Sequence, residues 1–463
     1  MKASLVKCSC KILPWISWKT YLLGSRLCTL VYHQQMEKYY LLDGNAALAW
    51  DKVSKCGEIA RCELHELALL ESEHVVEADG RVQVHESSGN TKCYDALPRG
   101  FCEAIKREGY VFDVHWDLTN KCNSRCIHCY NSHSHDGLRN DNAFDELTFG
   151  QAIELVDCLD YLGVFRIVLS GGEAMTKEYF FDLCRYIRSK HIALIIYTNG
   201  LLLTDSNVRK LAELQPASVC VSSYGPCGEV HDKVSSVKGS YAMVVAGLAR
   251  LKKCSIKTCH KNTLLKPNYK YWRETFDKGC AISDNSMINA TIYPSMDDGS
   301  VTQYALTEEQ LLELALQPGS PLDFRKQLRG VCNIAKGDFC SPCYDETNQL
   351  YISPNGDVYP CIAAPYKLAN VKVDDIKPLK RYVVNSNFNA ECDDTDMVGR
   401  LDNWRSLKIS YLKECGKYDY CQFCVDVCPG DAYVMCGDYL AAPMNHCVIA
   451  KARHKASLIE KNA

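Results

Sequence analysis

The sequence predicts an α/β fold built on a partial, open (β/α)6 barrel, with a smaller domain on each side of it. Strand-like and helix-like segments alternate from about residue 110 to residue 300, the pattern of a parallel sheet with helices on its outside. After about residue 320 this periodicity fades and cysteines become dense, which is typical of a small metal-organised domain. The predicted domains are residues 1–105, 106–320 and 321–463.

Six strands are predicted in the central domain, fewer than the eight of a closed barrel. They are Val111–Leu118, Phe165–Ser170, Ile192–Thr198, Ser218–Ser223, Ser255–Leu265 and Met287–Tyr293. Helices are expected between them, at Thr148–Gly163 and at about 177–190, 205–214, 240–253 and 268–279. Thr148 with Gln151, and Thr307 with Gln310, are capping-box pairs that mark helix starts.

The amino-terminal region looks separate from the barrel. It is expected to contain a hairpin within Ile12–Tyr32, a strand at Tyr39–Leu42 and helices at Ala46–Val53 and His65–Leu70. Residues 84–95 are polar and are expected to form a linker loop.

Cysteine is the unusual feature of the composition, with 28 residues in 463. The amino terminus lacks the apolar core and cleavage site of a signal peptide, and no apolar run is long enough to span a membrane. We therefore expect a cytoplasmic protein without membrane contact, whose cysteines bind metal rather than form disulfides. Its net charge of −3 gives no reason to expect nucleic acid. Cys158 and Cys184 lie in apolar helical stripes and are expected to be core residues.

Three cysteines with the spacing CxxxCxxC follow the first barrel strand: Cys122, Cys126 and Cys129. Thiolate is a soft ligand that suits zinc or an iron–sulfur cluster. A structural zinc needs a fourth ligand, which His128 or His133 could supply. Three cysteines on a four-iron cluster instead leave one iron open, and the spacing favours the cluster.

The next two strands end in Gly171-Gly172-Glu173 and in Thr198-Asn199-Gly200. Glycines let a backbone approach a ligand closely, and a carboxylate can hold an ammonium group. Because ligands of parallel α/β folds bind at the carboxyl ends of the strands, these segments are expected to lie at one site with the cysteine loop.

With these motifs the chain resembles the radical S-adenosylmethionine (SAM) superfamily over about residues 110–300. The resemblance implies that Cys122, Cys126 and Cys129 hold a 4Fe–4S cluster and that Gly171, Gly172 and Glu173 hold the methionine amino group of SAM. His128 stands where the family has an aromatic residue near the adenine. Thr198 and Ser222 lie on strands that contribute ribose or carboxylate contacts. The implied chemistry is reductive cleavage of SAM to a 5′-deoxyadenosyl radical, which removes a hydrogen atom from the substrate.

The carboxyl-terminal cysteines resemble the SPASM extension of peptide-modifying superfamily members, which holds two auxiliary 4Fe–4S clusters. Gly356 and Cys361 match its GxxxxC spacing. The resemblance implies one cluster on Cys343, Cys361, Cys428 and either Cys340 or Cys332. It implies a second on Cys415, Cys421, Cys424 and Cys447, with Cys421 replacing the usual cysteine at Tyr418. Cys392 and Cys436 are assigned to neither cluster. Structural zinc sites are the alternative.

Two further segments carry weaker resemblances. Tyr224-Gly225 to His231-Asp232 is typical of this subgroup, and Cys227 just after the fourth strand could return a hydrogen atom to a substrate radical, as an epimerase requires. Residues Tyr39–Trp50 resemble the core of the small winged-helix domain (PqqD-like) that binds leader peptides as an added strand.

The combined interpretation is a maturase that oxidatively crosslinks a ribosomally synthesised precursor peptide, through a thioether or a carbon–carbon bond. It would use SAM, three 4Fe–4S clusters and a reducing partner of the flavodoxin or ferredoxin type. Peptide epimerisation and side-chain oxidation of the sulfatase-maturase kind are alternatives, although Ile362 stands where the latter usually has an acidic residue. A non-catalytic zinc-binding interaction protein is the alternative from another class.

Overall fold

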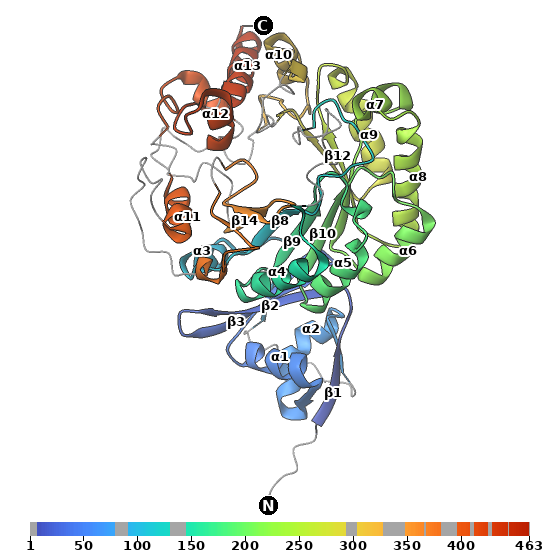
Figure 1. Ribbon diagram of the computed structural model, residues 1–463, viewed down its shortest axis with the longest axis vertical. Helices are drawn as coiled ribbons and strands as arrows, with labels where there is room; N and C mark the ends of the chain where they lie inside the picture. Colours follow the sequence, from blue (N-terminus) through green and yellow to red (C-terminus); the bar gives the residue numbers. More distant parts are fainter. Residues whose placement is uncertain are drawn as a thin grey trace, which may run out of the picture.

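The computed structural model describes residues 7–78, 91–129, 145–292, 303–326, 348–364, 367–380, 396–407, 412–424, 428–442 and 444–462. Among these residues the chain forms sheets of three, four and nine strands. The nine-stranded sheet is the centre of the molecule, the amino-terminal region lies at one end of it, and helices α12 and α13 lie at the other end (Figure 1). The fold is the predicted α/β class with a parallel core sheet.

The barrel consists of six parallel strands in sequence order, as predicted. They are β8 (Asp113–Asp117), β9 (Arg166–Ser170), β10 (Ala193–Thr198), β11 (Ser218–Ser222), β12 (Thr258–Thr263) and β13 (Asn285–Asn289). The outer helices are α4 (Phe149–Tyr161), α5 (Phe180–Ser189), α6 (Asp205–Leu214), α8 (Ser240–Lys253) and α9 (Trp272–Ile282). A large apolar core joins the strands to the helices and includes Cys184, with Cys158 packed against it.

Local signals mark the helix ends correctly. Thr148 and Thr307 cap their helices in full capping boxes with Gln151 and Gln310, and the second box opens α10 (Glu308–Leu316). Gly163 follows α4 with φ +85°, a conformation that favours glycine. Within the described part of the barrel, one helix was not predicted: α7 (Gly228–Ser235) lies between β11 and α8.

A segment from the carboxyl-terminal part extends the barrel sheet. Strand β14 (Gln349–Ile352) pairs in parallel with β8, and the short antiparallel strands β15 (Asp357–Tyr359) and β16 (Ala369–Asn370) follow at the edge. This pairing brings the GxxxxC turn beside the first barrel strand. The same part of the chain also contains α11 (Met397–Ser406), α12 (Pro429–Cys436) and α13 (Met444–Lys461).

The amino-terminal region forms two small sheets. Strands β2 (Ile16–Leu23), β3 (Arg26–His33), β4 (Lys38–Asp43) and β7 (Thr91–Tyr94) make the four-stranded one, and β1 (Lys7–Ile12), β5 (Glu58–Ala60) and β6 (Val76–Ala78) make the other. Helices α1 (Gly44–Cys56) and α2 (Ala68–Ser72) accompany them, and α3 (Arg99–Arg107) leads to the barrel. The expected loop at 84–95 is wrong for Thr91–Tyr94, which pairs with β4; residues 84–90 lie outside the described residues.

The four-stranded sheet closes the amino-terminal end of the barrel. Tyr21 and Leu30 share one buried cluster with Phe101 of α3 and with Phe112 and Phe165 of the barrel. Figure 1 shows β2 and β3 running across this end of the barrel, away from the carboxyl ends of its strands. This end of the barrel is therefore covered by the amino-terminal region. The winged-helix character of residues 1–105 stays a prediction.

Candidate active site at the carboxyl ends of the barrel strands

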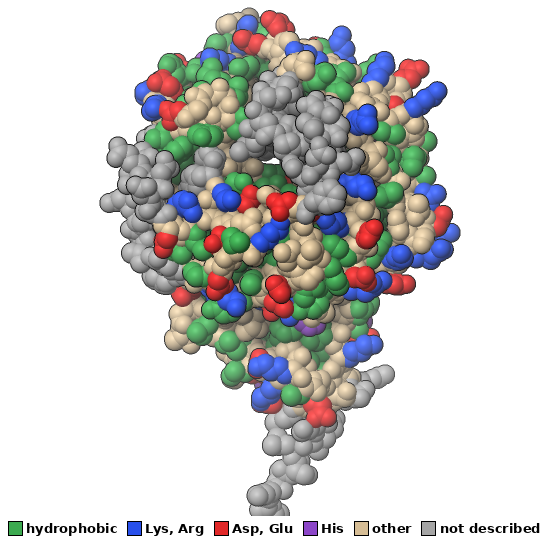
Figure 2. All heavy atoms as spheres, viewed as in Figure 1, with side chains coloured by type: hydrophobic (Ala, Val, Ile, Leu, Met, Phe, Trp, Pro, Cys, Tyr) green, Lys and Arg blue, Asp and Glu red, His purple; other side chains and the backbone are tan. Residues whose placement is uncertain are grey.

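A cavity of about 510 Å³ lies at the carboxyl ends of the barrel strands. Strand register aligns these ends, because Asp117 pairs with Ser170, Thr198 with Val221, and Ser222 with Lys261. The space-filling view shows an opening between the regions of α12 and β12 (Figure 2). The lining includes eight of the predicted site residues: Cys122, Cys126, His128, Cys129, Gly171, Gly172, Thr198 and Ser222. The volume is that of a typical small-molecule site.

The cysteine loop is held in place by the helix that was not predicted. The backbone N–H groups of Arg125 and Ile127 donate to the carbonyls of Ser235 and Val234 at the end of α7, at 3.2 and 3.0 Å. Ser124 lies between these residues, and its hydroxyl donates to the Ser235 carbonyl at 3.0 Å. The three thiols thus face the cavity on an anchored loop, and such a soft, clustered donor set fits an iron–sulfur cluster.

Burial, together with smaller contributions from the neighbouring Cys129 and Cys122 thiols, raises the pKa of Cys126 to about 11. The ligand form of cysteine is the thiolate, so binding a metal centre here releases a proton from this residue.

Both glycines of the Gly-Gly-Glu segment lie against the backbone that leads into the cysteine loop. A Cβ atom on Gly172 would come within 2.3 Å of the Lys121 carbonyl oxygen, and one on Gly171, whose φ is +125°, within 2.5 Å of the Thr119 carbonyl oxygen. The Gly172 N–H donates to that Thr119 oxygen at 2.7 Å. Glycine is therefore required here for close contact between the end of β9 and the cysteine loop.

Gly172→Ala is expected to displace the cysteine loop, because the added methyl group meets a backbone carbonyl that cannot rotate away. We expect a loss of about 1–3 kcal/mol in the free energy of unfolding and loss of iron from the loop, measured by urea unfolding and iron analysis. Gly150→Ala is the matched control, since nothing lies within 4 Å of its Cβ position. Unchanged iron in Gly172→Ala would contradict the assigned contact.

Glu173 links the ends of two strands from a fully buried position. Its carboxylate accepts hydrogen bonds from the Thr198 hydroxyl at 2.9 Å and from the backbone N–H groups of Asn199 at 2.8 Å and Met175 at 3.3 Å. Burial raises the pKa of Glu173 to about 7, although these donors oppose the rise. Unlike its two neighbouring glycines, Glu173 is not among the described residues that line the cavity.

His128 faces the cavity from the cysteine loop. Its ring meets the Tyr224 ring edge to face at 4.7 Å, and burial lowers the pKa of His128 to about 4, so the imidazole is neutral. Its Nδ1 atom is buried and has no hydrogen-bond partner among the described residues. A neutral flat ring with a free nitrogen is suited to contact a nucleobase. His231, in contrast, is structural, because its Nδ1 accepts from the Tyr224 N–H at 3.0 Å.

Cys227 is the residue that precedes α7, and it is not among the described residues that line the cavity. The hydrogen-atom donor role considered for it stays a prediction without support from its position.

Two family models match the chain: the radical SAM superfamily over residues 116–278 and the SPASM iron–sulfur cluster-binding domain over residues 343–394. The chain is a radical SAM protein with a SPASM domain.

Similar curated proteins have different substrates in their names. The AdoMet-dependent heme synthase of Methanosarcina barkeri is 23% identical over 353 residues, which are 71% of this chain and 93% of that protein. The mycofactocin maturase MftC of Mycolicibacterium smegmatis is 34% identical over 136 residues, 29% of this chain and 33% of that protein.

Solved structures share the fold. SuiB of Streptococcus suis, bound to its precursor peptide SuiA, aligns with a TM-score of 0.50 and 15% identity over 84% of this chain and 94% of that one. The enzyme anSMEcpe with bound AdoMet aligns with a TM-score of 0.55 and 16% identity over 75% of this chain and 97% of that one. At this identity the likeness is one of fold.

Beyond the residues that the SPASM model matches, the four cysteines predicted for one auxiliary cluster gather in one place. Electrostatic interaction with Cys447, Cys424 and Cys421 adds to burial in raising the pKa of Cys415 to about 12. Cys415 and Cys424 also pack against the same buried leucine, Leu412. Among the described residues, no three His, Cys, Asp or Glu side chains lie close enough to surround a single metal ion. A four-iron cluster holds its thiolates farther apart than one ion does, because iron and sulfide lie between them.

The other predicted cluster is only partly visible. Cys361 and Cys428 are both buried, and a Cβ atom on Gly430 would lie 1.8 Å from the Ala363 carbonyl, so the start of α12 lies directly on the turn after Cys361. Cys340, Cys343 and the alternative Cys332 lie outside the described residues, as does Cys392. Cys436 donates to the Ala432 carbonyl within its own helix, as expected of a spare residue.

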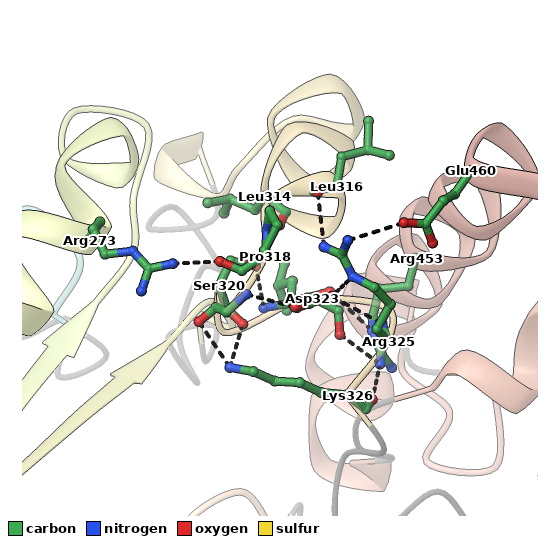
Figure 3. A network of polar contacts seen from close by, with 12 residues as sticks. Arg273, Leu314, Leu316, Pro318, Ser320, Asp323, Arg325, Lys326, Arg453 and Glu460 are labelled. Atoms are coloured by element: carbon green, nitrogen blue, oxygen red, sulfur yellow. Dashed lines mark hydrogen bonds and ion pairs between the residues drawn. The ribbon is translucent and has the colours of Figure 1, made fainter. Parts of the chain in front are cut away.

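A buried arginine ties α13, which carries Cys447, to the segments around it. Arg453 donates to the carbonyls of Phe423, Lys326 and Leu322 at 2.6, 2.9 and 3.2 Å and to that of Asp323 at 3.4 Å. Figure 3 shows the guanidinium among the carbonyls of the 322–326 segment, beside the more exposed Arg325, which reaches Glu460. Because Phe423 precedes Cys424, the network holds two predicted ligand segments together.

Arg453→Met is expected to lower the free energy of unfolding by about 3 kcal/mol, because several buried carbonyls lose their donor, and to release about four irons. Urea unfolding and iron analysis measure both effects. Arg99→Met, at an exposed ion pair with Glu103, is expected to cost at most about 1 kcal/mol and no iron. Full iron content in Arg453→Met would contradict this role.

Sequence reasoning missed several cavity residues. His115, Tyr197 and Lys261 line the cavity from the barrel strands, and the Lys261 Nζ lies 3.7 Å from the centre of the Tyr197 ring. A charged residue within a predicted barrel strand was the available signal for Lys261. Asp431 on α12 also lines the cavity, and no local motif marks it.

No helix in the described part of the chain combines the length and apolar character that a membrane crossing requires.

Proposed function

We propose that this radical SAM enzyme oxidatively crosslinks a ribosomally synthesised peptide, through a thioether or a carbon–carbon bond. The observation that carries the proposal is the composition of the cavity. The cysteine loop forms one wall, while Ile362, Ala363, Asp431 and Val434 from the SPASM part form another. A substrate held between them contacts both the radical-generating side and the auxiliary-cluster side.

The described residues fit the cofactors that the proposal requires. Cys122, Cys126 and Cys129 would hold the SAM-cleaving 4Fe–4S cluster, with the His128 ring against the adenine and Ser222 near the ribose or carboxylate. When bound, this cluster and SAM supply the radical that removes a hydrogen atom. The anchored loop fixes the position of the thiolates, and the buried walls keep water from the reacting atoms. Forming a crosslink also removes an electron and a proton from the substrate; the auxiliary clusters are the proposed electron acceptors, and the proton would pass to solvent.

A peptide substrate has support from the similar proteins and from the amino-terminal region. SuiB was solved with its precursor peptide, and MftC is named a maturase. Within the described part of the four-stranded sheet, β7 pairs only with β4, and such an edge can accept a peptide as an added strand. A flavodoxin or ferredoxin type of donor would supply the reducing electron.

Other substrates and outcomes stay open to test. The heme synthase named among the similar proteins makes a tetrapyrrole the main rival substrate. Peptide epimerisation has less support, because Cys227 does not line the cavity. Sulfatase-maturase-like oxidation has less support because Ile362 occupies the expected acidic position.

Co-expression of the enzyme with each short reading frame that flanks its gene tests the proposal. We expect one peptide to lose two hydrogens per modification by mass spectrometry, with fragment ions missing between the linked residues. A peptide of unchanged mass that gains deuterium from D2O would indicate epimerisation instead. Modification of an added iron porphyrin, with no peptide changed, would overturn the proposal.

A further inference from the structure

Two helices of the SPASM part build a buried carboxylate site in the wall of the cavity. Asp431 on α12 is 1% exposed, and His446 on α13 is fully buried. The His446 Nε2 atom lies 2.9 Å from Asp431 Oδ2, and the Asn445 side-chain amide donates to the same oxygen at 3.0 Å. The side chain of Asp431 is therefore fixed from behind by two residues of another helix.

The second oxygen of Asp431, Oδ1, takes part in neither of these contacts. Both contacts fall on Oδ2, and Asp431 is one of the residues that line the cavity. No described residue donates a hydrogen bond to Oδ1. Asp431 also lies in the first turn of α12, where the backbone N–H groups favour a negative charge. A buried anion with one open oxygen is costly unless a donor or a cation occupies the space in front of it.

No cation of the described cavity wall fills that role. Lys261 lines the same cavity from β12, but its ammonium lies over the Tyr197 ring, and no ion pair joins it to Asp431. The neighbours of Asp431 in the wall are Val434, Ile362 and Ala363, which offer no charge. Asp431 is therefore an acidic residue in a largely apolar part of the cavity wall, where a charge-assisted hydrogen bond is strongest.

We propose that Asp431 binds a cationic side chain, lysine or arginine, of the peptide substrate and thereby determines which residue enters the cavity. This inference rests on the proposed peptide-modifying function. Asn445 and His446 act as positioning residues, since they hold the carboxylate without facing the substrate. Val434 and Ile362 would contact the aliphatic part of the same side chain.

Binding of two small amides to the reconstituted enzyme with SAM tests the inference. The probes are N-acetyl-lysinamide and its uncharged counterpart N-acetyl-norleucinamide, followed by ligand-observed NMR. In the wild type we expect the lysine amide to bind at least about tenfold more tightly. Asp431→Asn should abolish this preference, and Asp438→Asn, which removes a carboxylate paired with Lys413, should keep it. Ile362→Trp, which fills the cavity beside Asp431, should weaken binding of both amides.

Equal binding of the two amides by the wild type would overturn the inference, as would an unchanged preference in Asp431→Asn. The comparison of the two amides on the wild-type enzyme tests the inference even if Asp431→Asn does not fold. The amides bind without radical chemistry, so failure here leaves crosslinking intact. Absence of a modified peptide in co-expression would be a separate failure, of the proposed function.

Discussion

Glu173→Gln is expected to weaken SAM binding at least tenfold and to abolish most SAM cleavage. The resemblance to the superfamily motif predicts that Glu173 holds the methionine ammonium, although Glu173 is buried and is not among the described residues that line the cavity. A neutral amide binds an ammonium group less strongly than a carboxylate does. The amide oxygen can still accept from the Thr198 hydroxyl and the Asn199 N–H, which both reach Oε2, but the N–H₂ group then faces the Met175 N–H. Equilibrium binding of SAM and release of 5′-deoxyadenosine measure the two effects. Unchanged affinity would contradict the assignment.

The same variant has a predicted pH signature. The folded state keeps the proton on Glu173 up to a pKa of about 7, above the ordinary value of 4.5. The contribution of Glu173 to the free energy of unfolding is therefore fully present below about pH 4.5. It is lost as the pH rises toward and through 7. Relative to Glu173→Gln, the wild type should lose about 3 kcal/mol of unfolding free energy between pH 5 and 8. The exposed Glu178→Gln should show no such trend; a constant difference for Glu173→Gln would contradict the burial argument.

Tyr21 belongs to the amino-terminal sheet but packs against the barrel. Tyr21→Ala is therefore expected to lower the free energy of unfolding by about 3–5 kcal/mol. Tyr21 is 1% exposed on β2, its ring meets those of Tyr110 and Phe101 edge to face at 5.0 and 5.8 Å, and its hydroxyl donates to the Gly163 carbonyl at 3.1 Å. Truncation removes these contacts and leaves a cavity at the interface between sheet and barrel.

Urea unfolding followed by both circular dichroism and cluster absorbance measures this effect. We expect both signals to shift together, because the sheet and the barrel share one core. Leu22→Ala, at the next residue of β2 and 55% exposed, should change stability by less than about 0.5 kcal/mol. An early transition of the amino-terminal region alone, with the cluster signal unchanged, would contradict the shared core.

The parts of the fold that the sequence predicted are those with local causes. Capping boxes at Thr148 and Thr307 act within four residues, and the barrel strands β9, β10 and β11 each carry their own apolar run. The pairing of β14 with β8 was not predictable, because it joins Gln349–Ile352 to a strand more than 200 residues earlier. Strand β7 was missed because its residues are mostly polar. Its strand conformation is stabilised by pairing with β4, which the sequence of β7 alone does not indicate.

The site residues also fall into those that local sequence signals predict and those that depend on the packing of distant segments. The CxxxCxxC and Gly-Gly-Glu segments follow predicted strands, so the carboxyl-end rule placed them at one cavity. The reason for Gly172 was different from the expectation, since it approaches the cysteine loop itself as well as lining the cavity. Asp431 and His446 could not be found, because their contact depends on how α12 and α13 pack and no spacing in the sequence encodes it.

The most direct test of the account is the iron and sulfide content of the anaerobically reconstituted enzyme, compared with a variant in which Cys122, Cys126 and Cys129 are all alanine. Three four-iron clusters predict about twelve irons in the wild type and about eight in the variant, with SAM cleavage lost only in the variant. Zinc in place of iron, or an iron content that the triple substitution leaves unchanged, would contradict the radical mechanism and favour a zinc-binding interaction protein.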